Sequence, residues 1–391
     1  MSAATAMTPR ERVRTALDHR EPDRIPFDLG GSRMTGIHVS AYPRLREALG
    51  LAPVEPRVSD LAQQLADIDT DVMDRLGCDV RVLVPGSGVG YRREMVEADG
   101  YISYVDEWGA ARRMPLQGGL YYDTHGAPLA GEPDAATIDG FPWPDGTDPA
   151  RFVGLADAAR HIIETEQRAV MVGSISSGLS EGLFKMRGFE DGYLDLAAEP
   201  DRARQVMEKM LEVKLAYWDR ALRELGPDVD VIGEADDLGG QDRLLYAPAT
   251  YRKLVKPLQA ELFSFIHART KAKIFLHSCG AIREIIPDLI EIGVDILNPV
   301  QVSAAHMDSA ELKAEFGRDI VFWGGGVDTQ RVLGTGTPDQ VRADVRRRIG
   351  DLRSGGGFIF ATVHNVQPNV PVENLMAMWE TWREEASYDR S

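Results

Sequence analysis

The sequence predicts an α/β protein folded as a (β/α)8 barrel with a β-rich insertion or lid. Short apolar runs rich in β-branched residues alternate with helical segments along most of the 391 residues. Eight or so runs of this kind can be recognised. Polar side chains follow the ends of these runs, which is where such barrels carry their active sites. Together these observations favour a closed barrel over a doubly wound sheet.

The first elements of the chain already alternate between helix and strand. Residues 9–19 are predicted to form a helix, residues 24–31 a strand that ends in a glycine turn, and residues 39–49 a second helix. A further helical stretch precedes the run at residues 79–85, which ends in proline and glycine as a strand with its loop commonly does.

Residues 90–149 break this pattern. They contain an alternating, strand-like segment at residues 101–105 and a turn-rich segment at residues 141–146, and no helix of ordinary length fits between them. We expect a single barrel domain over residues 1–391, with residues 90–149 as a β-rich insertion. The insertion either covers a site as a lid or serves as a structural flap.

The alternation resumes after residue 149. Strands are predicted over residues 169–173, 230–234, 272–277, 295–299, 320–324 and 357–363. Helices are predicted over residues 152–166, in the stretch that ends at residue 225, and over residues 248–270, 282–291, 309–316 and 338–353. These elements complete the set that a (β/α)8 barrel requires.

Composition excludes several classes of function. The formal charge of -17, from 61 acidic and 44 basic residues, opposes binding to nucleic acid or to an anionic membrane. The two cysteines are too few for a disulfide framework, which favours a reducing compartment. No signal-peptide core and no apolar run of about 18 residues is found, so we expect a cytoplasmic protein.

The most informative segment is residues 274–280, where an apolar strand ends in a histidine, a cysteine and a glycine. Residues two apart in an extended chain point the same way, so His277 and Cys279 can face one site. Nitrogen and sulfur donors favour zinc among the common metals. The alternative is a buried Cys279 that acts as a small apolar residue beside a hydrogen-bonded histidine.

Other polar side chains follow the predicted ends of other strands and are candidate site residues. They are Asp28, Arg33 and His38 after the first strand, Glu234, Asp236 and Asp237 after another, and Asn298 and His364 after two later ones. Because the carboxyl ends of barrel strands meet at one face, these side chains are expected to gather there.

Each candidate has a functional and a structural interpretation. His364 is a third metal ligand, a proton carrier, or a cap on the barrel. Glu234 is a fourth ligand or a catalytic base, or it pairs with Arg33 or another basic residue. Asp237 lies in an acidic run that orients a histidine, binds a cationic substrate group, or is solvated. Arg33 binds a substrate carboxylate or pairs with Asp28, and Asp28, His38 and Asn298 are further candidates for substrate binding.

Several sequence blocks are similar to a known family. They are residues 21–26, residues 234–239 with Pro248 and Tyr251, residues 277–280, residues 324–328, and residues 371–374. In this order they resemble the uroporphyrinogen decarboxylase superfamily, which also contains zinc-dependent methyltransferases that work with corrinoid proteins. The resemblance covers nearly the whole chain and implies a (β/α)8 barrel.

Within the superfamily the chain resembles the methyltransferase branch more closely. His277 and Cys279 match the first two ligands of that branch's zinc motif, whereas the third, a downstream cysteine, is absent and His364 lies near its place. The resemblance therefore implies either a zinc site of His277, Cys279 and His364, with Glu234 as a fourth ligand, or a site without metal. It also implies cobalamin carried on a separate corrinoid protein.

Three functions remain open from the sequence. The first is a zinc-dependent methyltransferase that moves a methyl group between a small-molecule donor or acceptor and a corrinoid protein. The second is a decarboxylase of uroporphyrinogen or another carboxylic acid, in which Arg33 binds a carboxylate and His364 delivers protons. This chain lacks the decarboxylase's arginine-rich N-terminal motif and has Pro85 where that enzyme has a catalytic aspartate. The third is a non-catalytic ligand-binding barrel, and a homodimer is the default oligomer.

Overall fold

A computed structural model describes residues 7–388 of the chain and contains a parallel sheet of seven strands in the order β13–β12–β11–β10–β9–β8–β3. The strands are β3 (Val80–Leu83), β8 (Ala169–Gly173), β9 (Val231–Ala235), β10 (Lys273–His277), β11 (Ile296–Asn298), β12 (Val321–Trp323) and β13 (Phe358–Ile359). Each strand follows its neighbour in chain order, as expected for consecutive βα units.

The extended segment at residues 25–29 closes this sheet into a barrel. On one side Asp79 N donates to Phe27 O over 2.9 Å, and on the other Asp28 N donates to Phe360 O over 2.9 Å. Phe27 and Phe360 form a parallel bridge. The segment therefore takes the place of the eighth strand between β3 and β13, and the predicted (β/α)8 barrel is confirmed.

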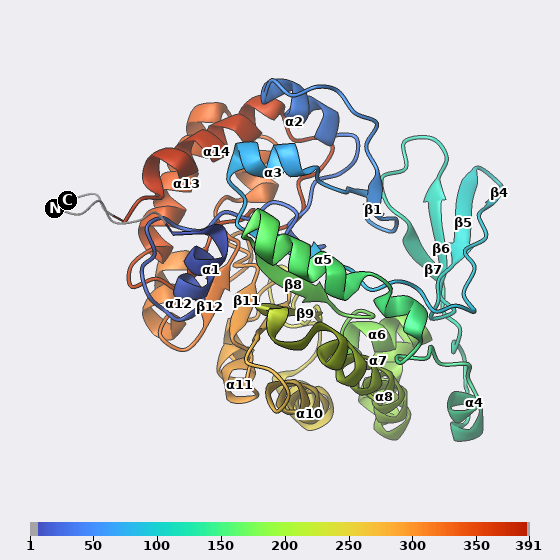
Figure 1. The fold of residues 1–391 in the computed structure, drawn as a ribbon. Helices are drawn as coiled ribbons and strands as arrows, with labels where there is room; N and C mark the ends of the chain where they lie inside the picture. Colours follow the sequence, from blue (N-terminus) through green and yellow to red (C-terminus); the bar gives the residue numbers. More distant parts are fainter. Residues whose placement is uncertain (1–6, 389–391) are drawn as a thin grey trace.

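Helices surround the barrel on its outside (Figure 1). They are α1 (Pro9–Leu17), α2 (Tyr42–Ala48), α3 (Thr70–Leu76), α5 (Leu155–His161), α6 (Leu179–Arg187), α7 (Phe189–Ala198), α8 (Pro200–Leu225), α9 (Pro248–Thr250), α10 (Lys256–His267), α11 (Ile286–Glu291), α12 (Ser309–Phe316), α13 (Pro338–Leu352) and α14 (Val372–Glu385). Short 3-10 or π-helical turns also occur, at Pro149–Phe152, Ile162–Glu166, Gly226–Asp228, Tyr251–Val255, Arg283–Ile285 and Thr329–Leu333.

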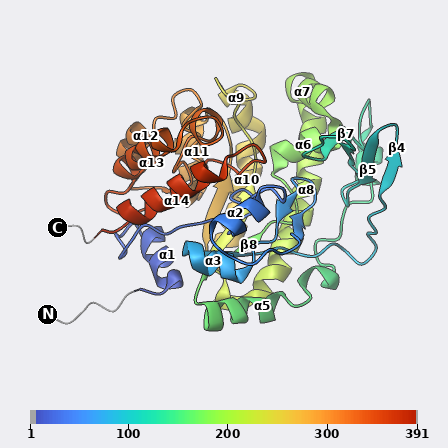
Figure 2. The ribbon, with the colours of Figure 1, turned by 90° about the horizontal axis from the view of Figure 1, so that it is seen from above.

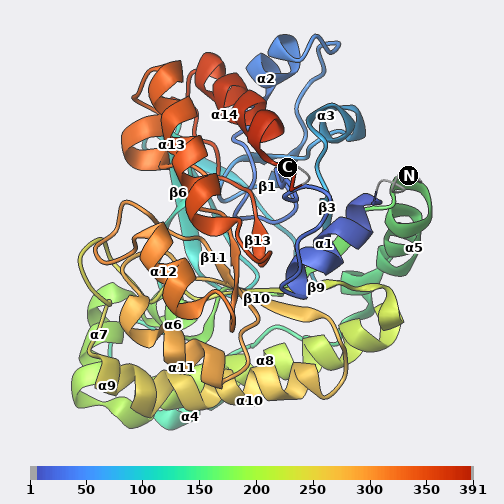
Figure 3. The ribbon, with the colours of Figure 1, turned by 90° about the vertical axis from the view of Figure 1, so that its left-hand side faces the viewer.

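Local sequence signals explain several of these helices. Thr8 and Thr337 each begin a helix with a reciprocal capping box, in which Glu11 and Gln340 are the partners. Helix α14 was not among the predicted elements. It lies beside α13 (Figure 3), and Arg342 of α13 pairs with Glu380 of α14 at 3.2 Å.

The apolar core is divided into two layers. The inner layer fills the barrel and includes Phe275, Trp323 and Ile359, and it is closed at the bottom by Val13 and Leu17 of α1. The outer layer lies between the strands and the surrounding helices. Successive side chains of a strand point alternately into and out of the barrel. The inward-pointing residues at the carboxyl ends of the strands therefore lie at the mouth of the barrel.

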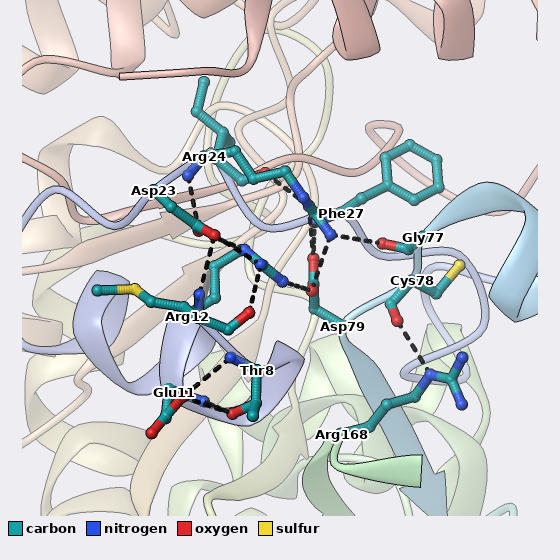
Figure 4. A network of polar contacts seen from close by, with 12 residues as sticks. Thr8, Glu11, Arg12, Asp23, Arg24, Phe27, Gly77, Cys78, Asp79 and Arg168 are labelled. Atoms are coloured by element: carbon teal, nitrogen blue, oxygen red, sulfur yellow. Dashed lines mark hydrogen bonds and ion pairs between the residues drawn. The ribbon is translucent and has the colours of Figure 1, made fainter. Parts of the chain in front are cut away.

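The seam near the first strand is held by buried charges (Figure 4). Asp79 is fully buried at the start of β3 and accepts hydrogen bonds from Arg12 Nη1 at 2.6 Å, Arg24 Nη1 at 2.9 Å and the backbone of Phe27 at 2.8 Å. Arg12 also pairs with Asp23 at 2.6 Å. Because the buried carboxylate is fully paired, it ties α1 and the first strand to β3.

The segment between β3 and β8 forms a separate antiparallel sheet of four strands, which stands to one side of the barrel (Figures 1 and 2). Its elements are β4 (Val96–Ala98), β5 (Tyr101–Val105), β6 (Ala111–Pro115) and β7 (Asp123–Gly126), followed by the short helix α4 (Ala135–Asp139). A two-stranded hairpin of β1 (Val58–Asp60) and β2 (Leu65–Ala66) lies earlier in the chain. The division into one domain with an insertion at residues 90–149 stays a prediction.

Among residues 7–388, no helix combines the length and the apolar character needed to cross a membrane.

Candidate functional site

Three side chains converge at the mouth of the barrel. One ligand atom each from His277, Cys279 and His364 lies within 4.8 Å of the other two. His277 Nε2 is 3.5 Å from Cys279 Sγ, and the His277 and His364 rings meet with centroids 5.4 Å apart. Two strand ends that are far apart in the sequence, those of β10 and β13, thus deliver two imidazoles and a thiol to one place.

The path of β10 explains how His277 and Cys279 reach this place. Phe275 points into the barrel, so His277, two residues later, points the same way but one layer higher. Gly280 then turns the chain with φ of +93°, and a Cβ there would lie 2.3 Å from the backbone of Gly239. Only glycine allows the loop after β9 to cross the loop after β10 so closely, which places Cys279 at the mouth.

Burial shifts the pKa values of His364 and Cys279. It lowers the pKa of His364 to about 4, with a further lowering from His277, so that the His364 ring is neutral at physiological pH. Burial also raises the pKa of the Cys279 thiol well above its ordinary value, and the carboxylates of Asp237 and Glu181 raise it further. Without a cation the site therefore holds a neutral imidazole and a protonated thiol.

Asn298 orients the ring of His277. The Nδ1 atom of His277 lies 2.6 Å from Asn298 Oδ1, and the Nδ2 group of Asn298 donates to the carbonyl of Trp323 over 2.8 Å. Both Asn298 and His277 are buried. Asn298 was predicted to bind substrate, but in the structure its side chain contacts the protein on both sides.

Asp237 lies beside the three converging groups. Its Oδ1 accepts a hydrogen bond from the backbone N–H of Cys279 at 2.8 Å and lies 3.7 Å from His277 Nε2. Its side chain is 43% exposed, so one face of the carboxylate is open to solvent or substrate. The neighbouring Asp236 is buried and accepts from the first backbone N–H groups of α6, at Ser180 and Glu181, which makes it a structural residue.

Glu234 lies apart from the three groups. Its carboxylate accepts hydrogen bonds from Lys214 Nζ at 2.7 Å, Trp218 Nε1 at 2.6 Å and Ser174 Oγ at 2.9 Å. Lys214 is fully buried and Glu234 nearly so. The structure thus gives Glu234 a basic partner other than Arg33, because α8 brings Lys214 against the end of β9.

A cavity of about 340 Å³ opens next to Cys279 and His364. The other residues that line it are Gly239, Gly240, Gln241, Gly280, Gln301, Thr329, Gln330 and Val363. Within the described part of the chain, this lining contains no arginine, lysine or carboxylate. The cavity can therefore accept a small molecule beside the thiol and imidazole and can form neutral hydrogen bonds to it.

The structure does not bring the other predicted substrate-binding residues to this cavity. Asp28 is buried inside the barrel, where Trp323 Nε1 and Gly31 N donate to its two oxygens at 2.8 and 2.7 Å. Burial raises the pKa of Asp28 to about 6. Arg33 does not pair with Asp28; its Nε lies 3.6 Å from Asp60.

His38 also has a structural partner. Its Nε2 lies 3.1 Å from the carbonyl of Leu120 in the insertion, and its Nδ1 lies 2.8 Å from Ser40 Oγ. Burial lowers the pKa of His38, so the ring is neutral and can donate to that carbonyl from Nε2. His38 thus attaches the insertion to the loop after the first strand.

Sequence reasoning missed Lys214 and Trp218, the two residues of α8 that hold Glu234. The signal was present, because Lys214 falls on the apolar stripe of α8, between Leu211 and Trp218. A lysine on such a stripe requires a buried partner, and a carboxylate at a neighbouring strand end is the natural one.

Comparisons with solved structures and with curated sequences show which proteins this chain resembles. Among solved structures, a methyltransferase from Methanosarcina mazei superposes with a TM-score of 0.66 at 17% identity, covering 97% of this chain and 99% of that one. A GH113 beta-1,4-mannanase gives a TM-score of 0.38 at 9% identity, covering 92% of this chain and 99% of that one. No curated protein sequence matches the chain.

The family comparison covers most of the barrel. The family model described as Uroporphyrinogen decarboxylase (URO-D) matches residues 94–385, which include His277, Cys279 and His364. The match spans well over half of the 391 residues. The chain therefore belongs to the uroporphyrinogen decarboxylase family.

Proposed function

We propose that the chain is a zinc-dependent methyltransferase that moves a methyl group between a small molecule and a corrinoid protein. The observation that carries this proposal is the convergence of His277, Cys279 and His364 beside a cavity of about 340 Å³. The likeness to the Methanosarcina mazei methyltransferase supports the same branch of the family. Cobalamin, in this proposal, is carried by the partner protein.

The three side chains fit a zinc ion. In a tetrahedral site with zinc bonds of about 2.0 to 2.3 Å, neighbouring ligand atoms are separated by roughly 3.3 to 3.8 Å. The 3.5 Å between His277 Nε2 and Cys279 Sγ falls in this interval, and all three ligand atoms lie within 4.8 Å of one another, so a shift of at most about 1 Å would bring His364 to it. His364 has no hydrogen bond to its ring nitrogens among the described residues, although the ring is largely enclosed. A half-buried imidazole whose ring nitrogens have no hydrogen-bond partner in the described chain is available to bind a metal.

Zinc held by these residues would supply a Lewis acid that activates a thiol or helps an oxygen or nitrogen leave a methyl group. The chain's own groups do the rest. Cys279 would bind as the thiolate and so give up its proton, whereas each histidine would bind through the unprotonated nitrogen of its ring. Asp237, whose Oδ1 accepts from the N–H of Cys279 and lies 3.7 Å from His277 Nε2, would place a negative charge beside the bound cation. We leave Glu234 out of the ligand set because Lys214, Trp218 and Ser174 already occupy its carboxylate.

A decarboxylase is the second candidate, because the matching family model carries that name. Uroporphyrinogen bears many carboxylates, and cationic side chains are the natural partners for them. The lining of the cavity contains no arginine or lysine among the described residues, and Arg33 lies outside it, with its Nε 3.6 Å from Asp60. The neutral lining therefore supports a small methyl donor or acceptor over this tetrapyrrole.

The deciding experiment compares two reactions of the same zinc-loaded protein. In the first, methylcobalamin is offered with a panel of small thiols, and cob(I)alamin is offered with a panel of methyl ethers, amines and alcohols. The change in the corrinoid spectrum reports methyl transfer. In the second, uroporphyrinogen is offered and the products are separated by chromatography.

Methyl transfer that is lost in Cys279→Ser supports the proposal. Decarboxylation without methyl transfer would replace it with the second candidate. Tight binding of a corrinoid protein without turnover on any donor would indicate a non-catalytic barrel. Cys78→Ser makes the same substitution at the chain's other cysteine, which is not one of the three proposed ligands, and serves as the matched control for folding and purification.

A further inference from the structure

Asn298 is enclosed between two strands at the base of the site. It is fully buried on β11, and its register partner on the neighbouring strand β10 is His277. Its side-chain amide has two contacts, the Nδ2 group with the carbonyl of Trp323 at 2.8 Å and Oδ1 with Nδ1 of His277 at 2.6 Å. A fully buried amide must satisfy both ends within the protein, so its orientation is determined by these two partners.

The carbonyl of Trp323 decides which way the amide faces. A backbone carbonyl can only accept a hydrogen bond, so the NH2 end of Asn298 must face it. The oxygen of Asn298 then faces His277, and a carboxamide oxygen can also only accept. If the amide were flipped, Asn298 Oδ1 would face the carbonyl oxygen of Trp323. Neither oxygen can donate a hydrogen bond, so both would be buried without a partner, which is costly.

This contact determines the tautomer of His277. Nδ1 must carry the hydrogen that it donates to Asn298, and in the neutral ring Nε2 is then the nitrogen with the free electron pair. Nε2 is the atom that lies 3.5 Å from Cys279 Sγ and 3.7 Å from Asp237 Oδ1. The electron pair is thus directed at the place where the three candidate ligands meet.

Trp323 itself is held rigidly. Its indole Nε1 donates to Asp28 Oδ2 at 2.8 Å, and its ring meets Phe275 edge to face with centroids 5.3 Å apart. Asp28 Oδ1 in turn accepts from Gly31 N at 2.7 Å. The first strand, β12, β11 and β10 are therefore linked by one buried polar chain that ends at Nε2 of His277.

We infer that Asn298 is a positioning residue, which holds His277 as the Nδ1–H tautomer with Nε2 presented for coordination. This role differs from the substrate contact that the sequence predicted. The tautomer follows from hydrogen bonds of the protein alone, whereas its consequence for metal binding rests on the proposed function. Outer partners of this kind commonly change metal affinity by about 10- to 100-fold when they are removed.

The tautomer is tested first in the metal-free wild-type protein. Histidine labelled with 15N is observed by long-range 1H–15N correlation at about pH 8, where an ordinary imidazole is neutral. The signal of His277 is assigned by its loss in His277→Gln. We expect a protonated Nδ1 and an unprotonated Nε2. A protonated Nε2 in the wild type would overturn the inference without any variant of Asn298.

Two variants then separate positioning from stability. Asn298→Leu removes the acceptor, and we expect a mixture of tautomers and zinc binding that is weaker by about 10- to 100-fold, measured by competition with a chelator. Asn298→Asp keeps an oxygen facing Nδ1, and we expect it to retain the Nδ1–H tautomer and most of the zinc affinity. An unchanged tautomer in folded Asn298→Leu would contradict the inference, as would loss of the Nδ1–H tautomer in Asn298→Asp.

Asn374 provides a matched control. It is also buried, and its Nδ2 donates to the carbonyls of Leu333 and Gly336 at 2.9 Å each. Neither partner is one of the three proposed metal ligands. Asn374→Leu should lower stability and leave the tautomer of His277 and the zinc affinity unchanged. A wild-type protein that shows the Nδ1–H tautomer but binds no zinc would refute the proposed function and leave the role of Asn298 intact.

Discussion

The buried pair of Lys214 and Glu234 can be used to test whether Glu234 stabilises the fold or binds the metal. Lys214 Nζ lies 2.7 Å from Glu234 Oε2, and the two side chains are 0% and 2% exposed. Lys214→Met keeps most of the volume of the side chain and leaves the carboxylate buried without its cation. Breaking a buried pair by removing one partner costs about 3 to 5 kcal/mol. We expect this loss in the free energy of unfolding, with zinc binding unchanged.

The assay is urea unfolding of the metal-free protein, followed by circular dichroism and tryptophan fluorescence. The double variant Lys214→Met, Glu234→Gln removes both charges and keeps an oxygen that can accept from Trp218, so most of the stability should return. Zinc affinity is measured on the same samples. If Lys214→Met leaves stability unchanged and Glu234→Gln abolishes zinc binding, Glu234 is a metal ligand and not the buried partner of Lys214.

Three further predictions concern the neighbouring parts of the molecule. Gly239→Ala would place a Cβ 2.9 Å from the carbonyl of Cys279 and should weaken zinc binding, whereas Gly240→Ala meets nothing closer than 3.5 Å and should leave zinc affinity unchanged. The pKa of Asp28 is raised from 3.8 to about 6, so the folded state holds the proton more tightly. The stability of the wild type relative to Asp28→Asn should therefore be highest below about pH 4 and fall as the pH rises through about 6. Denaturant titrations in which this difference rises with pH would be inconsistent with a buried carboxyl whose pKa is raised. His38→Phe removes the contact with the insertion and should speed amide exchange over residues 116–126 without changing zinc affinity.

The barrel could be predicted from the sequence because each strand is a short apolar run with a clear beginning and end. All the predicted strands of the barrel lie within a few residues of those in the structure, and the helix predicted at residues 309–316 has the same bounds as α12. The helix α14 was missed. Its sequence contributed only a short motif at residues 371–374, and its place is determined by packing against α13.

The meeting of His277, Cys279 and His364 could also be anticipated, since strand ends of a barrel share one face. The roles of Asp28, Asn298 and Glu234 could not. A strand-end position does not show whether a side chain points into the open mouth or into a buried hydrogen bond. Trp323, His277 and Lys214 decide this, and each of them comes from another strand or helix.

Zinc K-edge X-ray absorption on the zinc-loaded wild-type protein reports the atoms that surround the metal. We predict one zinc per chain with one sulfur ligand at about 2.3 Å and imidazole nitrogens at about 2.0 Å, and loss of the sulfur shell in Cys279→Ser. A protein that retains no zinc after dialysis, or one whose zinc is surrounded only by oxygen, would contradict the claim that His277, Cys279 and His364 form a metal centre.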